Sequence, residues 1–238
     1  MILKTEGIVL RTLKHQDANL IATLYTREYG IRSFIIKSYR SSLSRSRHSY
    51  FQPLSIIDIV FLQKDNRSLQ KISESKIGVL LQEAQTEPVK MSIGLAIMEI
   101  FYDTVKEEEA NHPLYQFLRE LILRLDQSER HLVNLFIYFL VRFTAFLGFS
   151  PNDQAGQSGG VSFDLRGGTF REAAQNHDPI AKLFLRFYRS ELDNCQEITF
   201  SGTEKRHLIR LIFNYYEAHI DGFKYPQTLR VFSEVFGG

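Results

Sequence analysis

The chain has 238 residues and a formal net charge of only +2, with 44% hydrophobic and 24% charged residues. This composition is typical of a soluble protein of one large or two modest domains, and it excludes a uniformly basic chain. Any attraction to a polyanion must therefore come from a local concentration of charge.

The amino-terminal segment, the apolar windows and the single cysteine indicate the compartment in which the protein works. The first ten residues lack the apolar run of a signal peptide and include charged side chains. The most apolar window, 132–147, is shorter than the roughly 20 residues that a membrane-spanning helix needs, so we expect a buried helix there. Cys195 stands alone, which excludes an internal disulfide and favours the cytoplasm.

The first eighty residues are predicted to form five short strands. The apolar, β-prone runs lie at 7–10, 20–25, 31–37, 56–62 and 69–75. Between the second and third runs, 27–30 is predicted to be a turn in which Gly30 takes a positive φ. Five strands of this length indicate a small barrel such as the OB-fold, with a five-stranded SH3-like barrel as the competing architecture.

Beyond Thr86 the apolar period changes from 2 to 3.6, which predicts a helical domain. Helices are expected to begin at Pro88, at Pro113, after Ser128, at Pro179, after Ser201 and at Pro226. Ser128 is predicted to cap the third helix and Asp178 the fourth, while Ser201 and Glu204 form a capping box for the fifth.

The segment 150–176 is rich in glycine and has two short strand-like runs, which predicts a hairpin inserted among the helices. It contains no cysteine, and His177 stands alone at its end, so no metal site is expected. The predicted fold class is α+β. A five-stranded barrel, with the nucleic-acid-binding OB-fold as the first candidate, is expected at 1–80, and an all-α domain at 86–238 is expected to carry the small β-hairpin at 150–176.

A basic loop lies between the third and fourth predicted strands. The stretch Lys37 to His48 reads KSYRSSLSRSRH, and no Asp or Glu occurs between Tyr29 and Ile57. A polar loop that concentrates positive charge on a small β-domain suits a phosphate backbone. The alternative is a solvated surface loop that happens to be basic.

An OB-type barrel binds strands by combining a cationic track with aromatic stacking platforms. The candidates for the track are Lys4, Arg11, Arg32, Lys37, Arg40, Arg45 and Arg47. Tyr39 and Tyr50 flank the loop as candidate stacking residues. Phe34 and Phe51 are equally close in sequence, but we expect them in the barrel core.

No catalytic or nucleotide-binding motif occurs. The seven histidines show no metal-binding spacing, and the chain has no G-x-x-x-x-G-K-[ST] and no Gly-x-Ser-x-Gly. We therefore expect a protein that is not an enzyme and needs no cofactor.

Taken in order, these residues resemble the bacterial recombination mediator family RecO. The resemblance is carried by Lys4 to Leu10 and then by Asp17, Ile21, Thr23 to Thr26, Gly30, Lys37, Arg40, Ser44 and Pro53. Leu147-Gly148-Phe149 with Pro151 resembles the junction after the family's central helices. The match is specific as a set in the first third of the chain and looser beyond it.

The resemblance implies an OB-fold, a helical domain and binding of single- and double-stranded DNA. It also implies annealing of complementary strands and help for RecA, together with RecR, in displacing single-strand-binding protein during recombinational repair by the RecF pathway. Such a protein would work in the cytoplasm at the nucleoid. The alternative is a non-catalytic interaction scaffold that reaches DNA only through its partners.

The family's zinc finger and its groove for an acidic tail each correspond to a region of this chain. Many members carry a four-cysteine zinc finger where this chain has 150–176, so the hairpin is expected to be held without zinc by Val161, Phe163, Leu165 and Phe170. The family also binds the acidic tail of single-strand-binding protein in a basic, apolar groove among its helices. Candidate residues for that groove are Arg119, Arg124, Arg130 and Arg142, and the alternative for each is a solvated arginine on a helix exterior.

Overall fold

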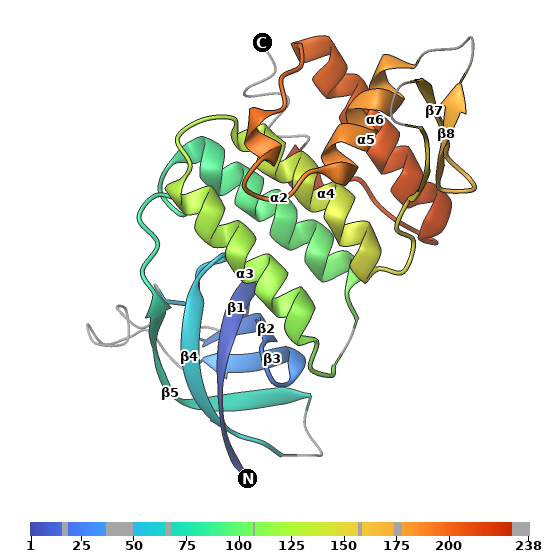
Figure 1. Cartoon of the computed structure of the whole chain (residues 1–238). Coiled ribbons are helices and arrows are strands. Elements are labelled where there is room, and N and C mark those ends of the chain that lie inside the picture. The colour runs from blue at the N-terminus through green and yellow to red at the C-terminus, as the bar shows by residue number, and fades with distance from the viewer. Residues whose placement is uncertain are drawn as a thin grey trace. The chain divides into compact units, whose positions relative to one another are not determined.

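The computed structural model describes residues 1–15, 19–36, 50–64, 68–106, 108–156, 159–173 and 178–229 (Figure 1). The basic loop 37–48 lies outside these ranges. The chain divides into two compact units, one of Met1–Gln127 with Gln227–Gly238 and one of Ser128–Pro226. The first two helices thus belong to the unit of the barrel, whereas the sequence-based division at 80–86 groups them with the helices that follow.

The first unit contains a closed barrel of five strands: β1 (Ile2–His15), β2 (Asn19–Thr26), β3 (Gly30–Ile36), β4 (Ile56–Leu62) and β5 (Leu69–Val79). The strands close in the order β1-β2-β3-β5-β4, and all neighbours are antiparallel except β3 and β5. This order with one parallel pair is the OB-fold topology, so the predicted OB-fold is confirmed and the SH3-like alternative is excluded.

The barrel interior is filled by alternate residues of the strands, as the period-2 pattern predicts. Its core comprises Leu3, Val9, Ala22, Leu24, Phe34, Ile36, Phe51, Ile57, Ile59 and Phe61. Phe34 and Phe51 are therefore core residues, as expected. Gly30 has a φ of 60°, which closes the turn between β2 and β3 in a conformation that glycine adopts without strain.

Two helices complete this unit, α2 (Pro88–Thr104) and α3 (His112–Gln127). Glu87 caps α2 by accepting from the backbone N–H of Lys90, and Pro88 occupies the first turn as predicted. Tyr25 of β2 joins both helices to the barrel, because its ring centroid lies 4.8 Å from that of Phe101 and 6.0 Å from that of Tyr115.

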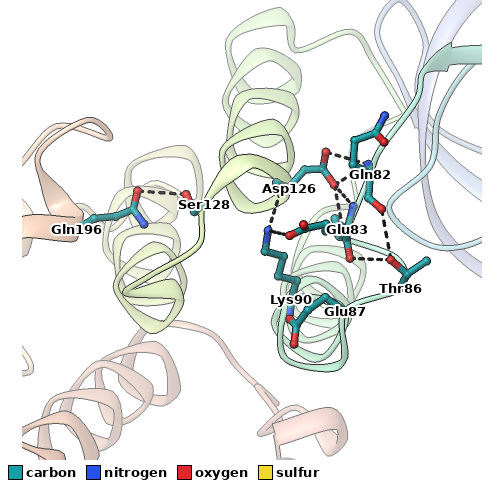
Figure 2. Close-up of polar contacts among 9 residues, drawn as sticks. Gln82, Glu83, Thr86, Glu87, Lys90, Asp126, Ser128 and Gln196 are labelled. Atoms are coloured by element: carbon teal, nitrogen blue, oxygen red, sulfur yellow. Dashed lines mark hydrogen bonds and ion pairs between the residues drawn. The ribbon is translucent and has the colours of Figure 1, made fainter.

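The segment between β5 and α2 is fastened to the end of α3 by Asp126 (Figure 2). The Asp126 carboxylate accepts three backbone N–H groups, from Gln82 at 3.0 Å, Glu83 at 2.8 Å and Ala84 at 2.7 Å. The buried Lys90 ammonium donates to the Asp126 carbonyl at 2.6 Å and pairs with the Glu83 carboxylate at 2.5 Å. Asp126 and Lys90 together thus fix the segment 82–84 to the end of α3.

The second unit holds α4 (Leu132–Phe146), α5 (Pro179–Arg189), the short 3-10 helix η1 (Cys195–Glu197) and α6 (Gly202–His219). A small sheet accompanies them, with β6 (Asn152–Gln154), β7 (Gly160–Asp164) and β8 (Thr169–Ala173) in the order β6-β8-β7. The predicted β-hairpin is therefore present as β7 and β8, and β6 adds a third strand parallel to β8.

The predicted caps of α5 and α6 are confirmed, but that of α4 is wrong. Asp178 accepts from two N–H groups at the start of α5, and Ser201 and Glu204 form a complete capping box. α4 instead begins after His131, whose φ of 54° is left-handed. Ser128 lies a turn too early and contacts Gln196 Oε1 at 3.2 Å instead (Figure 2).

Aromatic rings hold the hairpin against α5 and α6. The Phe163 ring centroid lies 4.7 Å from that of Phe170, 4.8 Å from that of Phe184 and 5.1 Å from that of Tyr215. Burial raises the pKa of Tyr215 to about 12, so its hydroxyl stays protonated near neutral pH and donates to the Phe149 carbonyl at 2.5 Å. Val161 and Phe170 are buried.

No helix within the described ranges is long and apolar enough to cross a membrane.

Candidate nucleic-acid interface

The two points at which the basic loop joins the barrel both border the last third of β1. β3 ends at Ile36, which is paired with Leu20, and Leu20 is paired in turn with Lys14 of β1. After the loop the chain returns at Phe51, whose carbonyl accepts a hydrogen bond from Thr12 Oγ1 at 2.5 Å. Arg11 and Lys14, both exposed, therefore flank the loop's attachment points.

A β-bulge decides where Arg11 lies. The register between β1 and β2 shifts between Val9 and Arg11, so Leu10 is an extra residue in β1. Without it, Arg11 would share the face of Val9, which is a core residue. The bulge turns Arg11 to the outer face, where its guanidinium carbon lies 3.7 Å from the ring centroid of Tyr102 on α2.

Arg32 is already engaged by an acidic residue. Its Nη1 donates to Glu108 Oε2 at 3.2 Å, and its Nη2 donates to the Glu108 carbonyl at 2.9 Å. The two residues share a hollow of about 360 Å³ with Lys64, bounded by β3, the end of β4 and the start of β5. Glu108 is 80% exposed, so this surface pair is weak and a phosphate can compete with it.

Lys4 is not brought to the same part of the barrel. It lies on β1 opposite Val60 of β4, beside a shallow hollow that also includes Asp58, Glu74 and Lys76. Lys76 pairs with Asp58 at 3.3 Å. Among the described residues, this face carries both signs of charge, with Asp58 and Glu74 beside Lys4 and Lys76.

Of the two candidate stacking residues, the structure describes Tyr50 but not Tyr39. Tyr50 is half-buried and packs against the barrel core, which leaves less of its ring for a base. Tyr39 lies outside the described residues, as do Lys37, Arg40, Arg45 and Arg47. Their contact with nucleic acid stays a prediction.

The four helical arginines are divided between the two compact units. Arg119, on α3, donates to Glu6 Oε1 at 3.1 Å, and Arg124 follows it on the same helix. In the second unit, Arg130 is exposed just before α4, and Arg142 of α4 lies 4.0 Å from Glu191 Oε2. A groove for an acidic tail built from these four residues stays a prediction.

The residues of the hairpin do not fit a four-cysteine zinc site. Cys195, the single cysteine, is buried in η1 and its Sγ contacts the Leu192 carbonyl at 3.2 Å. Across the parts of the chain that the structure describes, no three His, Cys, Asp or Glu side chains gather as a group that could hold a metal ion.

Sequence reasoning missed three residues of this region: Lys14, Tyr102 and Lys106. Lys14 follows Arg11 on the same strand and needed only the recognition that β1 continues to His15. Lys106 Nζ lies 5.5 Å from the ring centroid of Tyr102. Tyr102 and Lys106 are about ninety residues from Arg11 in the chain, so only the packing of α2 on β1 reveals their proximity.

The barrel places the chain among OB-fold proteins, a class whose strands and loops bind oligonucleotides and oligosaccharides. The family model described as Recombination protein O N terminal matches residues 1–78, and that described as Recombination protein O C terminal matches residues 85–228. The chain therefore belongs to the RecO family of DNA repair proteins.

Three relatives illustrate the similarity, and each bears the name DNA repair protein RecO. The protein of Flavobacterium psychrophilum is 30% identical and that of Flavobacterium johnsoniae 31% identical, in each case over 99% of this chain and the whole relative. The protein of Bacteroides fragilis is 31% identical over the same shares of the two chains.

Proposed function

We propose that this protein is a non-catalytic recombination mediator that binds single- and double-stranded DNA at the end of its barrel where the basic loop 37–48 is attached. One observation carries this proposal: Arg11 and Lys14 flank both attachment points of a loop that contains Lys37, Arg40, Arg45 and Arg47. Two exposed cations of β1 thus lie beside the ends of a segment whose sequence supplies four more, in a chain whose net charge is only +2. Local charge of this kind attracts a phosphate backbone without reading its sequence.

The mediator role adds steps beyond binding. Holding two strands with their phosphates neutralised and their bases exposed promotes annealing, and the same contacts allow RecA to load where single-strand-binding protein is displaced. RecR and the acidic tail of single-strand-binding protein are the proposed protein partners. This work belongs in the cytoplasm at the nucleoid. The family membership and the OB-fold barrel support these assignments.

The experiment is a titration of a labelled single-stranded oligonucleotide at several salt concentrations, followed by fluorescence anisotropy. The expected result is a linear fall of log affinity with log salt, with a slope of about −0.7 for each phosphate contacted. Absence of binding at low salt would instead favour the interaction scaffold. Annealing of complementary strands and RecA assembly on strands coated with single-strand-binding protein, each with and without RecR, then test the later steps.

A further inference from the structure

Arg11, Tyr102 and Lys106 form a small cationic and aromatic cluster where β1 meets the end of α2. The Arg11 guanidinium carbon lies 3.7 Å from the centroid of the Tyr102 ring, and Lys106 Nζ approaches the same ring at 5.5 Å. Lys106 Nζ also donates to the Tyr102 carbonyl at 3.3 Å. Tyr102 therefore orders two cations at once.

The charge of Arg11 is held in place without being neutralised. Arg32 is engaged by Glu108 and Arg119 by Glu6, whereas no carboxylate of the described residues pairs with Arg11. Stacking uses the face of a guanidinium and leaves the N–H donors along its edge for a planar or tetrahedral anion. Since its rotamers are already restricted by the ring, Arg11 loses less entropy when it binds such an anion.

The position of this cluster indicates which anion it meets. Thr12, the next residue along β1, donates to the carbonyl of Phe51, where the chain returns from the basic loop. The β-bulge at Leu10 is what turns Arg11 away from the core and toward Tyr102. A nucleic-acid strand that contacts the barrel beside Phe51 thus meets an exposed arginine whose guanidinium is already oriented.

We propose that Arg11 binds a backbone phosphate of the DNA strand and that Tyr102 is the residue that positions it, so that the interface extends from the barrel onto the end of α2. This inference rests on the proposed DNA binding. Lys106 supplies a second, weaker cation on the same path. The competing role is structural, in which the Arg11–Tyr102 contact only fastens α2 to the barrel.

The test is a double-mutant cycle measured by single-strand affinity and its salt slope. Arg11→Gln is expected to weaken binding and to make the slope shallower by about 0.7, the value of one lost phosphate contact. Tyr102→Leu is expected to weaken binding about two- to fivefold, in line with the strength of an exposed cation–π contact. Tyr102→Phe keeps the ring and should bind like the wild type. The double variant Arg11→Gln/Tyr102→Leu should lose clearly less than the sum of the two single losses, because, among the described residues, Lys106 is then the only cation that Tyr102 still positions.

Two controls keep the outcomes distinct. Arg27→Gln removes an equal charge from an exposed barrel arginine beside Glu28 and should leave the salt slope unchanged. Thermal melting shows whether Tyr102→Leu stays folded, and if it does not, Tyr102→Gln and Lys106→Gln replace it. Unchanged affinity and slope in Arg11→Gln, or fully additive losses in the double variant, would overturn the inference alone. A wild type that binds no DNA would overturn the proposed function as well.

Discussion

Arg119 of α3, a candidate for binding an acidic tail, pairs with Glu6 of β1 within its own unit. Glu6 Oε1 accepts from Tyr115 Oη at 3.0 Å and from Arg119 Nε at 3.1 Å, both from α3. Burial and the neighbouring Glu6 carboxylate together raise the pKa of Tyr115, so its hydroxyl remains a donor. The Arg119 side chain is 26% exposed and pairs with Glu6, so an acidic peptide that binds it would compete with this ion pair.

Asp126 allows a prediction about stability and pH. Burial alone would raise the pKa of its carboxyl, but the N–H donors of Gln82, Ala84 and Glu83, with Lys90, outweigh burial and hold that pKa below its usual value. The ionised form therefore stabilises the fold above about pH 3.9, the ordinary value for Asp, and this contribution is lost as pH falls through the lower folded pKa. We expect Asp126→Asn to lower the free energy of unfolding at pH 7 by about 1–3 kcal/mol.

Urea denaturation of the wild type and of Asp126→Asn, at pH 7 and at pH 3, measures this change in the free energy of unfolding. The difference between the two proteins should shrink at the lower pH, because pH 3 lies below the ordinary pKa of Asp and part of the stabilisation by the ionised carboxylate is lost there. An equal difference at both values would show that the carboxylate charge is not what fastens this turn.

At the scale of elements, the close approach of α2 to the barrel depends on a glycine. Leu54, which precedes β4, is buried and has a φ of 76°, and a Cβ at Gly94 of α2 would lie 2.5 Å from its Cδ1. The strained backbone and full burial leave Leu54 little room to move. Gly94 is therefore a contact residue in the middle of a helix rather than a flexible point.

Gly94→Ala tests this contact. Alanine favours a helix over glycine by about 1 kcal/mol, but overpacking costs about 1–3 kcal/mol, so we expect a net loss of stability by urea denaturation. Gly202→Ala, at the open start of α6, is the matched control and should be neutral or slightly stabilising. A Gly94→Ala protein more stable than the wild type would contradict the packing described.

The hairpin of β7 and β8 yields a prediction about metal. Phe170 is fully buried among the rings of Phe163, Phe184 and Tyr188. We expect Phe170→Ala to cost about 3–5 kcal/mol and Phe170→Leu less, since leucine refills part of the cavity. Chelation by EDTA should leave the melting temperature of the wild type unchanged. A fall that added zinc reverses would show that metal, rather than aromatic packing, holds this sheet.

For the whole molecule, the sequence predicted what local patterns determine and missed what packing determines. The strands of the barrel follow from period-2 alternation, and the caps of α5 and α6 follow from side chains next to their own N–H groups. Ser128 had the right chemistry for a cap but the left-handed His131 moved the start of α4 beyond it. Local sequence does not encode such a shift.

In the candidate site, too, some residues are predictable from local sequence and others only from packing. The basic loop is predicted from charge alone, because an acid-free stretch is visible in the sequence, and Arg11 is predicted as a cation on a neighbouring strand. Tyr102 is not predicted, since a bulge in β1 and the docking of α2 together create its contact with Arg11. Arg119 and Glu6 are 113 residues apart, so their pairing is equally hidden in the sequence.

The DNA binding proposed for the cations of the basic loop 37–48 is tested most directly by one comparison. The single-strand salt slope is measured for the wild type, for Arg40→Ala/Arg45→Ala/Arg47→Ala, and for Arg27→Ala/Arg171→Ala/Arg189→Ala. The second triple variant loses the same charge from arginines that already pair with Glu28, Asp164 and Asp153. We predict that the loop variant binds more weakly, with a slope shallower by about 2, while the control keeps the wild-type slope. An unchanged slope and affinity in the loop variant would contradict the account.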